Sequence, residues 1–140
     1  VLRDGAEGFA VPPGRERIPV LVEEAARSGV DAVLHDGLEA PLADPVEQAI
    51  GRVAQESLAN AVRHASGSSV EVRLAEDGDA VLIEVVSRGG EALDAPELRG
   101  SGMGLRMLAE RVRMLGGEFE AGPEGDGWTV RARLPGGAQR

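Results

Sequence analysis

Two polar residues one helical turn apart, Glu56 and Asn60, could bind one ligand through a carboxylate and an amide oxygen. Hard oxygen ligands of this kind suit a cation such as Mg²⁺, which also binds phosphate groups. Arg63 and His64 follow within the next turn and could contact those phosphates through charge-assisted hydrogen bonds. The alternative interpretation is that all four residues belong to the solvated face of an ordinary amphipathic helix.

A helix over residues 44–65 must position these groups. Asp44 can cap its first turn, Pro45 suits the first helical position, and Glu47 lies where a capping-box carboxylate belongs. At about 100° per residue, the apolar residues gather on one side of this helix, away from the polar row. The apolar side consists of Ile50, Ala54, Leu58, Ala61, Val62 and Ala65. We therefore expect one face to pack and the other to be open to a ligand.

Three glycines at alternate positions, Gly100, Gly102 and Gly104, lead directly into a second predicted helix over residues 102–115. Glycine lets the backbone approach a bulky anion, and the start of a helix presents unpaired N–H groups. The stretch therefore predicts a polyphosphate-binding loop, with a flexible hinge before a helix as the alternative. It is not a Walker loop, because no Gly-Lys-Ser/Thr follows. It is not a Rossmann fingerprint either, because no strand immediately precedes it.

The other elements are predicted from hydrophobic periodicity and turn residues. Residues 18–27 form a short helix, and strands are expected over 30–38, 69–75, 81–86, 118–121 and 128–134. The second and third of these strands pair antiparallel through a hairpin, and the last two form a hairpin with a glycine-rich turn. The segment 87–102 lacks periodicity and is long for a connection, which is typical of a lid or a disordered loop.

The composition fits one globular domain. The 140 residues are 42% hydrophobic and 28% charged, which suffices for a single core. We expect a lead-in over residues 1–17, the domain over 18–135 and a tail over 136–140. A net charge of −9 argues against a nucleic-acid surface, because such binding depends on neutralising phosphates. The absence of cysteine excludes disulfides and thiolate metal sites.

The sequence also gives an expectation for the compartment. It holds no apolar run of about 18 residues, and its first residues are unlike a signal peptide. We therefore expect a soluble, cytoplasmic chain with no direct membrane contact. A membrane anchor elsewhere in the full-length protein stays open, because whatever precedes Val1 is not visible in this sequence.

The order of these motifs resembles that of the catalytic ATP-binding domain of sensor histidine kinases. The resemblance covers roughly residues 18–135 and is closest to the kinases that work with LuxR/NarL-type response regulators. It depends on ESLANAVRHA in the first long helix, SRGG after the hairpin and GSGMGL before the second long helix. The superfamily also contains gyrase, Hsp90 and MutL. The resemblance implies a two-layer α/β sandwich, the Bergerat fold, in which helices cover one face of a mixed, mostly antiparallel sheet.

The resemblance also implies roles for individual residues. In this family the asparagine of the helical motif binds Mg²⁺ and the preceding glutamate orients water or metal; the matching residues are Asn60 and Glu56. Arg63 and His64 match basic positions that approach phosphates. Further ATP-binding residues are expected in the two glycine motifs, namely Ser87, Gly89, Gly100, Gly102, Met103, Gly104 and Leu105.

One motif departs from the family pattern. The motif after the hairpin usually begins with an aspartate that accepts a hydrogen bond from the adenine amino group, and Ser87 stands at this position. A hydroxyl lacks the charge and the second oxygen of a carboxylate, so we expect a loss of about 1–3 kcal/mol in binding free energy. Glu91 replaces the second glycine of the same motif.

By this resemblance, the chain positions Mg²⁺-ATP for phosphoryl transfer to a histidine on an upstream dimerisation domain. The phosphoryl group then passes to an aspartate of a LuxR/NarL-type response regulator. Neither His35 nor His64 matches the phosphoacceptor motif, so the acceptor domain is expected outside this chain. Two alternatives stay open: a degenerate member of the fold that acts as a regulatory or interaction module, as Ser87 suggests, and an anti-sigma-factor serine kinase.

Overall fold

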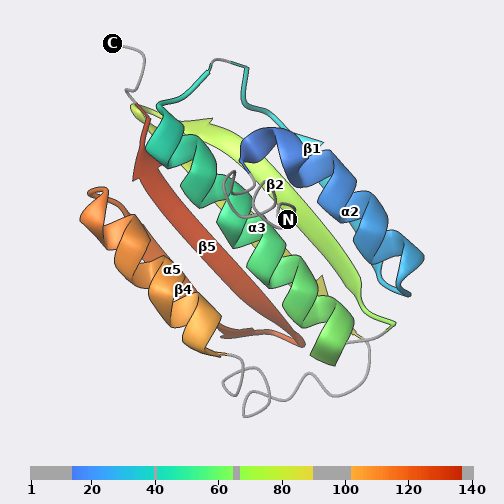
Figure 1. Cartoon of the computed structure of the whole chain (residues 1–140). Helices are drawn as coiled ribbons and strands as arrows, with labels where there is room; N and C mark the ends of the chain where they lie inside the picture. The colour runs from blue at the N-terminus through green and yellow to red at the C-terminus, as the bar shows by residue number, and fades with distance from the viewer. Residues whose placement is uncertain (1–13, 40, 65–66, 90–101, 137–140) are drawn as a thin grey trace, which may run out of the picture.

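The computed structural model describes residues 14–39, 41–64, 67–89 and 102–136. Its elements in chain order are η1 (Arg15–Arg17), α2 (Ile18–Arg27), β1 (Asp31–Asp36), α3 (Asp44–His64), β2 (Ser69–Asp77), β3 (Ala80–Arg88), α5 (Gly102–Met114), β4 (Glu118–Glu124) and β5 (Gly127–Pro135). Figure 1 shows α2, α3 and α5 side by side on one face of the sheet. The predicted two-layer α/β sandwich is therefore confirmed.

The five strands form one sheet in the order β1-β2-β3-β5-β4. β1 pairs parallel with β2, and the other three pairs are antiparallel. α3 lies between β1 and β2 in the chain and makes the crossover that a parallel pair requires. The prediction of a mixed, mostly antiparallel sheet with helices on one face is confirmed.

The core fills the space between the two layers, with α3 at its centre. Ile50, Val53 and Ala54 of α3 are fully buried. They lie above strand residues such as Val72 and Ile83, which are also fully buried. Each of the buried valine and isoleucine side chains contributes about 1.5–3 kcal/mol through burial. The core therefore fixes α3 against the sheet and determines which side of the helix faces away from the sheet.

The start of α3 agrees with its predicted position. The helix begins at Asp44, and a Glu47 carboxylate oxygen accepts a hydrogen bond from the backbone N–H of Leu42 at 2.9 Å. The carboxylate thus reaches back to Leu42, before the helix, and not to the backbone N–H of Asp44 as a capping box would. Residue 65, which the prediction included, lies outside the described residues.

All five strands differ from the prediction at one end or both: β1 is shorter than the predicted 30–38, and the other four are longer. β3 continues to Arg88, so Ser87 lies within a strand and not in a loop. β4 continues to Glu124, so the last hairpin turns at Gly125 and Asp126 and not over the wider segment 122–127. Pro123 is tolerated because β4 is an edge strand, and Gly125 takes the positive φ of 62° that a tight turn needs. Residues 90–101 of the predicted lid lie outside the described residues.

Charged pairs occupy the sheet face that points away from the helices. The Arg131 guanidinium donates to Glu84 Oε2 from Nε at 3.0 Å and from Nη2 at 2.6 Å. This hydrogen bond raises the pKa of Arg131 above its ordinary value. Arg133 Nε likewise donates to Asp77 Oδ2 at 2.9 Å.

Among the described helices, none is long and apolar enough to cross a membrane.

Candidate functional site

The two predicted ligand-binding motifs lie against each other. A Cβ built on Gly104 would collide with Glu56 Oε2 and would lie 2.6 Å from Glu56 Cδ. The Glu56 carboxylate of α3 therefore fills the space beside the first turn of α5 that any side chain at position 104 would need. In Figure 1 the last turns of α3, the first turn of α5 and the start of β5 lie at the same end of the molecule. The glycine at 104 lets helix and carboxylate approach this closely.

Asn60 lies one turn beyond Glu56 on the same side of α3. Its side chain is only 5% exposed, and its Oδ1 accepts a hydrogen bond from Arg63 Nη2 at 2.9 Å. This bond fixes the amide with its oxygen toward Arg63, and a carbonyl oxygen keeps a second lone pair for another partner. Glu56 is half-buried. The alternative of a solvated helix face is therefore wrong for Asn60.

Ser87 lies on the helix-facing side of β3, close to the end of the strand. It is 7% exposed and stands directly opposite Trp128 of β5 in the antiparallel pairing. Gly89 follows with a φ of 71°, a backbone conformation that favours glycine. The strand thus places the Ser87 hydroxyl in the layer between sheet and helices, where a ligand could reach it only from the end of the sheet.

The remaining predicted site residues divide into three groups. Leu105 is 7% exposed and belongs to the hydrophobic core, so it packs behind the glycine turn. His64 is the last residue of α3, and Gly102 and Met103 are the first two residues of α5. For these three residues the structure describes the backbone only. Gly100 lies outside the described residues. The structure thus brings Glu56, Asn60, Arg63 and the start of α5 together at one place.

The donor set restricts which metal this place could hold. Within the described residues, no three His, Cys, Asp or Glu side chains come together as a metal site. The chain offers one amide oxygen and one carboxylate here, from Asn60 and Glu56. A cation held by so few protein ligands takes its other ligands from phosphate and water, as Mg²⁺ does.

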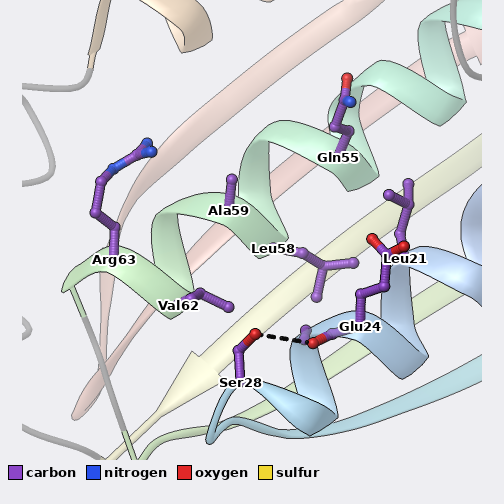
Figure 2. Close-up of a pocket in the computed structure, with 9 residues that line it drawn as sticks. Leu21, Glu24, Ser28, Gln55, Leu58, Ala59, Val62 and Arg63 are labelled. Atoms are coloured by element: carbon purple, nitrogen blue, oxygen red, sulfur yellow. Dashed lines mark hydrogen bonds between the residues drawn. The ribbon is translucent and has the colours of Figure 1, made fainter.

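A separate groove lies on the other side of α3, against α2. It has a volume of about 400 Å³ and an apolar floor, and Figure 2 shows Leu58 and Val62 pointing toward α2. Arg63 also lines the groove, although its guanidinium extends away from α2 in the same view. At its rim, Ser28 Oγ donates to the backbone oxygen of Glu24 at 3.0 Å. Glu56 and Asn60 do not line this groove, but Arg63 does, so the groove borders the candidate site at Arg63.

Two residues near the site were not predicted to belong to it. Trp128 is half-buried, packs against the core and is the cross-strand neighbour of Ser87. Ser57 Oγ is buried and, among the described residues, has no hydrogen-bond partner. The alternation of the last strand placed Trp128 on an apolar face, but its pairing with Ser87 depends on a register that local periodicity does not give.

Comparisons with known proteins agree with this geometry. The model of the family described as histidine kinase-, DNA gyrase B-, and HSP90-like ATPase matches residues 46–138. An uncharacterized sensor-like histidine kinase of Chloroflexus aurantiacus is 34% identical over 104 residues. That alignment covers 68% of this chain and 17% of the relative, so the chain spans about one sixth of that protein.

Solved structures show the same fold. The Acinetobacter baumannii histidine kinase AdeS superposes with a TM-score of 0.66 at 14% identity, over 87% of this chain and 62% of that one. The catalytic domain of histidine kinase ThkA gives a TM-score of 0.63 at 17% identity, over 86% of this chain and 88% of that one.

The predicted recognition is therefore confirmed at the level of the domain. The family match includes all of α3 from Val46 onward, α5 and the four strands β2 to β5, which together build the candidate site. The chain belongs to the family of histidine kinase-, DNA gyrase B- and HSP90-like ATPases.

Proposed function

We propose that this domain binds ATP together with Mg²⁺ in the space bounded by α3 and the start of α5, and positions the γ-phosphoryl group for transfer to a histidine. The observation that carries the proposal is the contact of the Glu56 carboxylate with the glycine turn at Gly104. The buried amide of Asn60 lies one turn away on the same side of α3.

The residues at this place fit a hard cation. Asn60 would hold Mg²⁺ through its amide oxygen, and Glu56 would hold it directly or through a water molecule. When bound, Mg²⁺ supplies neutralisation of the phosphate charge. The unpaired N–H groups at the start of α5 would bind the phosphates, beside the Glu56 carboxylate that fills the space next to Gly104.

Other residues would hold the nucleotide without taking part in the chemistry. Arg63 would keep the Asn60 oxygen turned toward the site through the hydrogen bond that it donates. His64, Gly100, Gly102 and Met103 would contact the phosphates. Ser87 and Gly89 would contact the base. Catalysis in such a site depends mainly on positioning and charge neutralisation, because phosphoryl transfer needs little covalent help from the protein.

The wider function follows from the same proposal. The phosphoryl group would pass to a histidine on a dimerisation domain outside this chain and then to a response regulator of the LuxR/NarL type. Ile18 to Pro135 would form the catalytic domain, and residues 1–17 and 136–140 would be flanking segments. We place this domain in the cytoplasm, where ATP and response regulators are found.

Equilibrium titration with Mg²⁺-ATP tests the proposal. We expect wild-type binding that requires Mg²⁺ and that Asn60→Ala reduces at least a hundredfold. Gln55→Ala is the matched control, because Gln55 lies on the same helix but lines the groove against α2. The control should bind as the wild type does. Absence of wild-type binding at millimolar nucleotide, or equal binding by Asn60→Ala, would contradict the proposal.

Ser87 favours a second candidate function, a degenerate module that keeps the fold without nucleotide. The substitution Ser87→Asp separates the two candidates. Binding only in this variant supports the degenerate module, whereas Mg²⁺-dependent binding by the wild type excludes it.

A further inference from the structure

Ser87 and Trp128 form a pair at one end of the helix-facing side of the sheet. They are directly opposite in the register of β3 and β5, and the next inward pair along these strands is Val85 and Val130, both 2% exposed. Directly opposite residues of an antiparallel pair point to the same face. Both side chains therefore point into the layer between sheet and helices.

This end of the layer is neutral. In β2, β3 and β5, which the structure describes throughout, Ser87 is the only polar side chain among the buried helix-facing positions. Val70 of β2 flanks it on one side and Trp128 on the other. A flat heterocycle here would meet the indole of Trp128, the methyl groups of Val70 and the neutral hydroxyl group of Ser87.

The pair of Ser87 and Trp128 also lies at the end of the molecule where the phosphates are proposed to bind. β3 ends one residue after Ser87, and β5 begins one residue before Trp128. Figure 1 shows that β5 starts at the end where α3 finishes and α5 begins. Asn60 lies in the last turns of α3 and therefore at this end. A nucleotide whose phosphates bind at Asn60 and Gly104 could therefore extend its base toward this pair.

We propose that Ser87 and Trp128 form the base subsite and that it accepts 6-amino and 6-oxo purines alike, so that the domain binds Mg²⁺-GTP about as well as Mg²⁺-ATP. This inference rests on the proposed function. A hydroxyl donates as well as accepts, so Ser87 accepts a hydrogen bond from the amino group of adenine or donates one to the oxygen of guanine. A carboxylate only accepts and would reject the guanine oxygen. The indole of Trp128 contacts any purine, because every base has a π face.

The test compares ATP and GTP on the same chain with Mg²⁺ present. Calorimetry gives the two dissociation constants, and the fluorescence of Trp128, the sole tryptophan of the chain, reports contact with the base. We expect constants within about tenfold of each other and a change in Trp128 emission with both nucleotides. Ser87→Asp should weaken GTP relative to ATP by about 10–100-fold.

Ser69→Asp is the matched control. It introduces the same carboxylate at an exposed position of β2 whose neighbours in the sheet are Asp31 and Arg88. It should leave the ratio of the two constants unchanged. Trp128→Phe keeps an aromatic face and should retain both ligands, whereas Trp128→Leu should weaken both about equally, by roughly tenfold or more.

The outcomes separate this inference from the proposed function. If Mg²⁺-ATP binds in a way that depends on Asn60 and Mg²⁺-GTP binds more than about tenfold more weakly, the inference is overturned and the proposed function stands. Binding measured by calorimetry without any change in Trp128 emission also overturns it. Absence of binding by either nucleotide overturns the proposed function and the inference together.

Discussion

The carboxylate of Glu56 occupies the space that a side chain at position 104 would need, so Gly104 and Glu56 form one unit although they come from different helices. Local sequence patterns predicted each motif but not this contact. Four predictions follow from the geometry at this end of the fold.

Gly104→Ala should weaken nucleotide binding while leaving the stability of the fold almost unchanged. Its methyl group would displace the Glu56 carboxylate, which is the end of a flexible side chain and can swing away. We expect Mg²⁺-nucleotide affinity to fall at least about tenfold, while the free energy of unfolding changes by less than about 1 kcal/mol, because alanine favours a helix over glycine. Calorimetry and urea denaturation give the two quantities.

A control and a double variant show whether Glu56 transmits this effect. Gly122→Ala adds the same methyl group at a position with nothing within 4 Å, and it should change neither quantity. In a Glu56→Ala background, Gly104→Ala should cause little further loss, because the carboxylate is no longer there to displace. An undiminished loss in that background would mean that the methyl group acts on the ligand and not through Glu56.

The interpretation of Arg63 as a positioning residue predicts a smaller effect. Arg63→Ala leaves the Asn60 amide free to rotate, so we expect the affinity for Mg²⁺-nucleotide to fall about three- to tenfold, less than for Asn60→Ala. Titrations with and without Mg²⁺ distinguish the possible causes. A loss confined to the Mg²⁺-dependent part supports positioning of Asn60, whereas an equal loss without Mg²⁺ would show that Arg63 acts on the phosphates themselves.

Much of the fold could be predicted because its signals are local. The cap at Asp44 and Glu47 and the apolar row of α3 gave this helix to within a residue. The turn at 122–127 was placed too widely, because glycine and proline usually end a strand, yet the edge position of β4 lets Gly122 and Pro123 stay within it.

The non-local parts of the site could not be predicted in the same way. Helical spacing showed that Glu56 and Asn60 share a side of α3, but not that Gly104 of α5 packs against Glu56 or that the Asn60 side chain is buried. The register between β3 and β5 sets Ser87 opposite Trp128, and a shift of one residue would have moved both to the other face. Such relationships depend on packing between elements far apart in the chain.

Ser57→Ala should stabilise the domain in the absence of ligand. The hydroxyl is buried and, within the described part of the chain, unpaired, so its removal relieves a desolvation cost of about 1 kcal/mol. Urea denaturation measures the gain. Ser28→Ala provides the contrast, since that hydroxyl donates to the Glu24 backbone oxygen at 3.0 Å and its loss should not stabilise. A Ser57→Ala variant that is less stable than the wild type would show that the hydroxyl has a partner in solution.

Gly127→Ala should disrupt the sheet beside the proposed base subsite. A methyl group there would collide with the backbone oxygen of Ser87 and lie 3.0 Å from its carbonyl carbon. These are backbone atoms of a strand paired on both sides, so they cannot swing away as the Glu56 carboxylate can. We expect a loss of about 2–3 kcal/mol in the free energy of unfolding, within the range for overpacking, and a changed emission of Trp128 in the folded state. Gly122→Ala, in the same hairpin but with open space around it, should lose far less. Equal stability of the two variants would mean that β3 and β5 are further apart at this end than the register requires, and Ser87 and Trp128 could not then contact one base.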